Sequence, residues 1–93
     1  MKSKKIRYIP FTEDTQRVFS TYDLGCSAGL ISMGYKLLGI DWLTGEPKAL
    51  FLFEENDELE ESAQQYWKDE LQVSALSYFN ALKNLKNQLY SNK

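Results

Sequence analysis

The spacing of apolar and polar positions changes several times along the chain, and each change predicts a new element. Residues 17–21 alternate between polar and apolar side chains, several of them β-branched or aromatic, which predicts a short β-strand. Asp23 then precedes apolar positions spaced by three and four, which is typical of a helix with an aspartate N-cap. Gly34 follows the last of these positions and suits the left-handed conformation that ends many helices.

After this glycine the spacing becomes that of β-strands. Residues 36–53 predict a β-hairpin whose turn contains Gly45, since glycine adopts positive φ without a steric penalty. The second hairpin strand is apolar on both faces, as central strands are, and we expect residues 17–21 to pair with its free edge. Alternation in the first hairpin strand predicts two faces, one formed by Leu38, Ile40 and Trp42, the other by Leu37, Gly39 and Asp41.

Two further helices are predicted after the hairpin. Six of the eight residues at 54–61 are acidic, and carboxylates are favoured in a first helical turn, which Asn56 or Asp57 can cap. Ser74 can cap the last helix, which we expect over residues 75–90. The predicted apolar stripe of this last helix consists of Ala75, Phe79, Leu82, Leu85 and Leu89.

The order β-α-β-β-α-α predicts a single α+β domain over residues 11–93, in which a small three-stranded antiparallel sheet packs with helices. Residues 1–10 are rich in lysine and are interrupted by proline, so we interpret them as a basic flexible arm. At 43% hydrophobic residues the chain can form a core without disulfides or metals. A domain of this size buries only roughly 60–65% of its unfolded surface, which leaves a homodimer open.

The composition of the chain disfavours several kinds of catalytic and metal site. The chain has no histidine, which removes the commonest general base, the imidazole-dependent triads and most zinc sites. Its one cysteine cannot form an internal disulfide, which favours the cytoplasm, and no apolar run approaches the roughly 20 residues of a membrane span. We therefore expect no export signal, membrane segment, catalytic residue, cofactor or metal.

The segment GCSAGLISMG carries the only cysteine and three of the five glycines. Cys26 would lie in the first helical turn, where amide dipoles lower the pKa of a thiol. No imidazole and no second thiol accompanies it, so we favour a buried core residue over a nucleophile. The glycine spacing matches neither a dinucleotide-binding loop nor a P-loop, and we expect Gly25 and Gly29 to allow close packing of the helix on the sheet.

The acidic run is one candidate interaction surface. A block of like charge steers an oppositely charged partner, although a solvated helix start would show the same composition. Exposed aromatic rings next to it would add contact area, because tyrosine and tryptophan are enriched at protein interfaces. The predicted protein-binding residues are Glu55, Asp57, Glu58, Glu61 and Tyr66.

The basic positions form a second candidate surface. No acidic residue follows Ser74, so the last helix is locally cationic although the net charge of the chain is −2. If the N-terminal arm lay beside this helix, the cations would together contact phosphates in a salt-sensitive way. The predicted nucleic-acid-binding residues are Lys2, Lys4, Lys5, Arg7, Lys83 and Lys86.

One stretch resembles a known family. FSTYDLGCSAGLISMGYKLLGID has a phenylalanine and a threonine, then Asp-Leu, small residues, and a glycine before an apolar strand. With the strand ALFLFE and the final helix YFNALKNLKNQLYS, it is similar to domain of unknown function number 5659 over roughly residues 17–91. This family is associated with bacteria, archaea, phages and plasmids. The resemblance implies a small accessory protein, often linked to mobile elements, and brings no catalytic residues.

Together these observations predict a non-catalytic accessory protein that binds a macromolecular partner. Our first expectation is a protein partner within a nucleic-acid-processing, host–phage or mobile-element system. The alternative is direct binding of nucleic acid through the basic arm and the last helix. An enzyme that uses Cys26 is the third hypothesis, and the missing histidine disfavours it.

Overall fold

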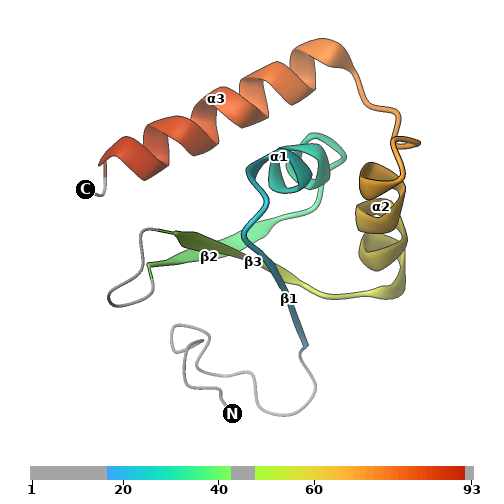
Figure 1. Ribbon diagram of the computed structural model, residues 1–93, viewed down its shortest axis with the longest axis horizontal. Helices are drawn as coiled ribbons and strands as arrows, with labels where there is room; N and C mark the ends of the chain where they lie inside the picture. Colours follow the sequence, from blue (N-terminus) through green and yellow to red (C-terminus); the bar gives the residue numbers. More distant parts are fainter. Residues whose placement is uncertain (1–16, 43–47, 92–93) are drawn as a thin grey trace.

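The computed structural model describes residues 17–42 and 48–91, and the elements follow one another in the predicted order (Figure 1). The predicted arm at 1–10, with Lys2, Lys4, Lys5 and Arg7, lies outside the described residues, as does the turn at Gly45. The elements are β1 (Val18–Thr21), α1 (Leu24–Ser32), β2 (Leu37–Trp42), β3 (Ala49–Glu54), α2 (Asp57–Trp67) and α3 (Ala75–Ser91).

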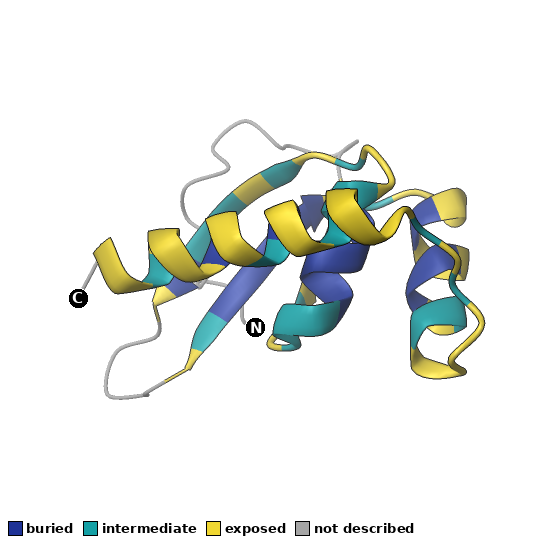
Figure 2. Ribbon diagram, turned by 90° about the horizontal axis from the view of Figure 1, so that it is seen from above, coloured by how far each residue is buried: buried dark blue, intermediate teal, exposed yellow. Residues whose placement is uncertain are grey.

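The three strands form an antiparallel sheet in the order β1-β3-β2, which confirms the predicted pairing. β3 is central because both of its faces are apolar, and Phe51, Leu52 and Phe53 are all buried. α1 lies between this sheet and α3, and it also packs against α2 (Figures 1 and 2). The protein is therefore an α+β fold in which the helices gather around α1.

β2 does not alternate as the sequence predicted. Leu37 pairs with Phe53 and Ile40 with Phe51, and the register shifts between Leu37 and Gly39. The shift inserts Leu38, whose exposed fraction is 37%, and transfers Leu37 to the face of Ile40. The predicted face was wrong for Leu37, because one bulged residue moves every residue before it to the opposite side of the strand.

The core forms where α1 meets the sheet and the other two helices. Phe51 and Phe53 supply its largest side chains from the sheet, and Phe19 of β1 packs against Phe53 with ring centroids 6.5 Å apart. The buried residues that the helices contribute to this cluster are Cys26, Ala28, Leu30, Leu59, Ala63, Ala81 and Leu85.

α3 presents a different face to the core from the one predicted. Leu82, Leu85 and Leu89 pack against the core as expected, whereas Ala75 is exposed and Phe79 has an exposed fraction of 55%. The neighbouring positions 78 and 81 face inward instead. A tyrosine at position 78 can pack its ring and still satisfy its hydroxyl, which an apolar pattern alone does not reveal.

The caps of the helices follow the sequence closely. Gly34 has φ of 104° and ends α1 in a Schellman arrangement, in which the amide of Tyr35 donates to the carbonyl of Leu30 at 3.1 Å. Ser74 caps α3 with its hydroxyl, which accepts from the amide of Ser77 at 3.4 Å. Within residues 17–42 and 48–91, no helix combines the length and apolar character that crossing a membrane requires.

Candidate binding site

Asp23 joins the start of α1 to the end of α2. Its Oδ1 accepts a hydrogen bond from the amide of Cys26 at 3.0 Å, which confirms the predicted N-cap. Its Oδ2 accepts from the indole Nε1 of Trp67 at 3.1 Å. Trp67 remains 53% exposed, so a large aromatic ring lies at the surface in a fixed orientation.

The face of α1 that carries Gly25 and Gly29 lies against side chains from α2 and from the segment that follows it. A Cβ on Gly25 would overlap the hydroxyl of Tyr66, and a Cβ on Gly29 would lie 3.1 Å from Cδ2 of Leu71. The prediction that both glycines pack on the sheet was wrong. Their spacing of four places them on one side of the helix, but it does not reveal which neighbour that side meets.

Tyr66 and Tyr78 lie together on this glycine face. The hydroxyl of Tyr78 donates to the carbonyl of Gly25 at 3.4 Å and is 3.3 Å from the position of a Gly25 Cβ. Burial raises the pKa of the Tyr66 hydroxyl, and the negative charge of Asp23 and the neighbouring Tyr78 raise it further. Tyr66 is therefore a neutral, half-buried ring at neutral pH.

A pocket opens beside the two tyrosines, where α2 gives way to α3. Its volume is about 190 Å³. It combines two phenol rings, two aliphatic side chains and one carboxylate, contributed by Tyr66, Tyr78, Leu71, Val73 and Asp69. Of the five, only Tyr66 was predicted as a binding residue. Asp69 and Val73 lie in an irregular connection, where apolar periodicity gives no signal.

Asp69 has an unusual backbone conformation. Its φ is 65°, and among the described residues no other residue apart from glycine has a positive φ. It occupies the position after the C-cap of α2, where the amide of Glu70 donates to the carbonyl of Gln65 at 2.7 Å. α2 thus ends as α1 does, with an aspartate in place of the glycine.

Cys26 is a core residue, as favoured from the sequence. It has no exposed surface. Burial raises the pKa of its thiol to about 12, and the carboxylate of Asp23 acts in the same direction. These effects outweigh the helix dipole, so the thiolate that a nucleophile requires is disfavoured at neutral pH.

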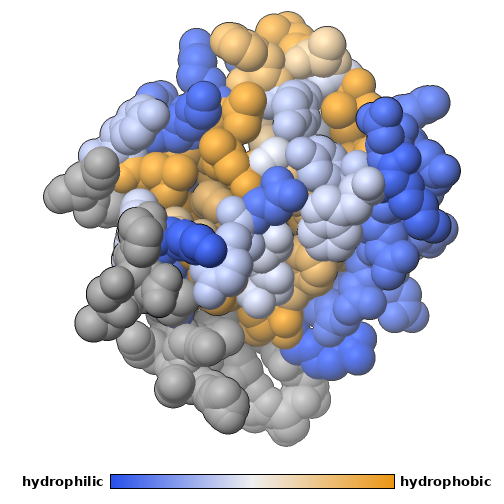
Figure 3. Space-filling model, in the orientation of Figure 1, coloured by the Kyte–Doolittle hydropathy of each residue, from blue (hydrophilic) through white to orange (hydrophobic). Residues whose placement is uncertain are grey.

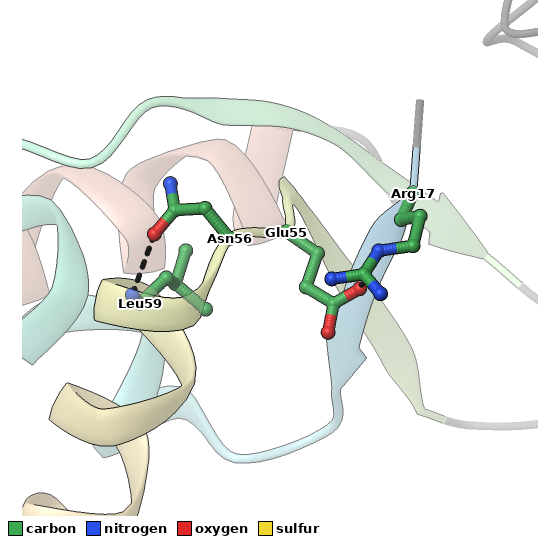
Figure 4. A network of polar contacts seen from close by, with 4 residues as sticks. All are labelled: Arg17, Glu55, Asn56 and Leu59. Carbon is green, nitrogen blue, oxygen red and sulfur yellow. Dashed lines mark hydrogen bonds and ion pairs between the residues drawn. The ribbon is translucent and has the colours of Figure 1, made fainter. Parts of the chain in front are cut away.

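The predicted acidic residues divide into two groups. Glu55 forms an ion pair with Arg17, at 3.0 Å between Oε1 and Nε, and its side chain is only 14% exposed (Figure 4). Asn56 next to it caps α2 by accepting from the amide of Leu59 at 2.8 Å (Figure 4). The exposed carboxylates at the start of α2 are Asp57, Glu58, Glu60 and Glu61. Figure 3 shows hydrophilic side chains gathered over this helix.

The predicted basic residues of α3 are both exposed. Lys83 lies with its Nζ 5.5 Å from the centroid of the Phe79 ring, and Lys86 follows on the same side of the helix. Two large apolar residues of α3 are exposed as well: Leu76 and Tyr90 each have an exposed fraction of 68%. The two lysines of α3 thus lie between exposed apolar and aromatic side chains.

Comparison with known proteins identifies the family. No curated protein and no solved structure matches the chain. A family model described as a domain of unknown function (DUF5659) matches residues 16–91, which includes all the helices and strands of the described residues. The match confirms the resemblance noted in the sequence: the chain belongs to the DUF5659 family.

Proposed function

We propose that this protein is a non-catalytic accessory protein that binds a basic protein partner. The contact would be made by the α2 surface, which we define as Asp57, Glu58, Glu60, Glu61 and Trp67. We place the protein in the cytoplasm, in a nucleic-acid-processing, host–phage or mobile-element system. Glu55 is left out of this surface because its carboxylate pairs with Arg17 and its side chain is only 14% exposed.

The observation that carries the proposal is the exposed but fixed indole of Trp67. The residue is 53% exposed, and the hydrogen bond from Nε1 to Asp23 restrains the orientation of its ring. An aromatic ring fixed before binding loses little conformational entropy when a partner covers it. Tryptophan is also among the residues most enriched at the energetic centres of protein interfaces.

The charge of α2 indicates the kind of partner. Four exposed carboxylates lie in its first turns, and Lys68 at the C-cap is the first base that follows them. Such a field increases the rate of encounter with a basic surface and disfavours acidic ones. The charged residues would mainly set the association rate and partner choice, while Trp67 would supply contact area.

The test is affinity capture from the native host with nuclease-treated lysate at low salt. The triple variant Asp57→Asn, Glu58→Gln and Glu61→Gln should retain several-fold less of a protein partner than the wild type, because steering is weakened. A matched control, Asn80→Lys with Asn84→Lys and Asn87→Lys, changes the net charge equally from exposed positions on α3. Equal retention by the wild type and the acid variant would contradict the proposal.

Direct nucleic-acid binding is the second candidate, and the pair of Lys83 and Phe79 favours it. A lysine beside an exposed aromatic ring can contact a phosphate while the ring stacks on a base. Lys83→Ala with Lys86→Ala should then weaken binding to all sequences and reduce its salt dependence. A wild-type protein that gives no mobility shift with DNA or RNA at low salt would eliminate this candidate.

We rank a protein partner above nucleic acid because α3 carries few cations that could contact phosphates. Affinity for nucleic acid depends on how many phosphates the cations neutralise, and α3 contributes two lysines, Lys83 and Lys86. The remaining predicted cations lie in the arm, outside the described residues.

A further inference from the structure

We propose that the pocket between Tyr66 and Tyr78 receives one cationic side chain, a lysine or an arginine, from the partner protein. This proposal rests on the proposed function for the identity of the partner, but not for the chemistry of the pocket. The site would anchor a basic segment that also contacts the α2 surface, since Tyr66 directly precedes Trp67 in α2.

The size of the pocket restricts its occupant. Pockets that hold a whole drug-sized ligand have volumes of roughly 300–1,000 Å³. The volume here is about 190 Å³, which suits one side chain rather than a nucleotide or a cofactor. The pocket therefore fits a group of the size of a side chain.

The residues that line the pocket favour a positively charged occupant. The faces of phenol rings attract ammonium and guanidinium groups, and Tyr66 and Tyr78 supply two such rings. Leu71 and Val73 offer aliphatic surface to the methylene groups that lysine and arginine carry behind their charge. Asp69 is the charged group of the lining, and it repels an anion.

The pocket is preorganised from both sides. Gly25 leaves no Cβ to displace the Tyr66 ring, and its carbonyl accepts from the Tyr78 hydroxyl. Asp69 has positive φ at a helix end where glycine is the usual residue.

In the experiment, the protein is titrated with n-butylammonium and, in parallel, with N-butylguanidinium. N-butylurea serves as the neutral analogue of both, and the ionic strength is kept constant. Methyl NMR signals of Leu71 and Val73 report on binding. We expect saturable shifts with both cations and several-fold weaker binding of the urea. Asp69→Asn should weaken binding of the cations by about two- to fivefold, the usual range for a partly exposed ion pair.

Glu70→Gln is the matched control, because it removes a neighbouring exposed carboxylate that does not line the pocket. It should leave the affinity of the cations unchanged. The proposal is overturned if the urea binds as tightly as the cations, which would indicate an apolar pocket. It is equally overturned if the wild type shows no saturable shift.

The small-molecule titration separates this proposal from the proposed function. Cation binding with no protein partner after nuclease treatment would refute the partner but not the pocket chemistry. A partner captured through the α2 surface with no cation binding would refute the pocket alone.

Discussion

At the scale of single residues, the side chain of Asp23 accepts two hydrogen bonds near the candidate site. One oxygen caps α1 and the other holds the indole of Trp67. A single carboxylate therefore both starts a helix and fixes the exposed ring of another. Stability and the proposed binding are coupled at this residue.

Replacing Asp23 should separate its two roles. Asp23→Ala loses the cap and the indole bond, about 1 kcal/mol each, so unfolding in urea should show a loss of about 2 kcal/mol. Asp23→Asn can still cap with its oxygen but turns an NH₂ toward the indole N–H, and should lose about half as much. Trp67→Phe removes the same indole bond, so its effect should not add to that of Asp23→Asn. Full stability of Asp23→Asn would show that the indole bond contributes nothing.

Gly34 and Asp69 occupy equivalent positions at the ends of two helices. Both have positive φ, but only glycine adopts it without a steric penalty. Gly34→Ala should lower the free energy of unfolding by about 1 kcal/mol, whereas Asp69→Gly should raise it by up to about 1 kcal/mol. Thermal and urea unfolding measure both changes. A less stable Asp69→Gly would show that relief of the positive φ does not outweigh the loss of the aspartate side chain and the greater freedom of glycine in the unfolded chain.

At the scale of elements, the glycine face of α1 determines how closely the tyrosines approach. The ring of Tyr66 cannot move aside easily, but the tip of Leu71 next to Gly29 can. The two glycines, although four residues apart on one helix, should therefore respond differently to a methyl group.

Gly25→Ala should destabilise the protein by about 1–3 kcal/mol, as overpacking does. Gly29→Ala should be nearly neutral, because the better helix propensity of alanine, up to about 1 kcal/mol, offsets a small shift of Leu71. Tyr66→Phe removes the oxygen that a Gly25 Cβ would overlap and should rescue Gly25→Ala in part. Equal effects of the two alanines in urea unfolding would show that the tyrosine ring does not limit the packing.

At the scale of the whole molecule, stability should fall in alkaline solution. The pKa of Cys26 is raised to about 12 from 9.0, and that of Tyr66 is raised as well, so the folded state keeps protons that the unfolded state has lost. For Cys26, the stabilisation is complete below pH 9 and is lost toward pH 12, by up to about 1.4 kcal/mol per pH unit, and Tyr66 acts in the same direction. Cys26→Ala should flatten this slope in urea unfolding measured from pH 8 to 11. An unchanged slope would show that the thiol titrates normally.

The sequence predicts those parts of this molecule that are determined locally. Asp23, Gly34 and Ser74 mark helix ends because a cap is a short-range interaction. The bulge at Leu38 and the exposed Phe79 depend on contacts between distant segments, which periodicity does not contain.

The candidate site was predicted in part, for the same reason. Its charges are visible in the sequence, but the pocket arises where the end of α2 meets α1 and α3. Trp67 was not among the predicted binding residues. No local signal shows that its ring remains at the surface, bonded to a residue 44 positions earlier.

The central claim is that α2 binds a protein through its exposed tryptophan, and a matched pair of variants tests it. Trp67 is 53% exposed on α2, and Trp42 is 38% exposed at the end of β2. In affinity capture from nuclease-treated lysate of the native host, Trp67→Ala should reduce retention of the protein partner by about tenfold or more. Trp42→Ala should retain it as the wild type does. A partner retained equally by the wild type and Trp67→Ala, or no protein partner after nuclease treatment, would contradict the claim.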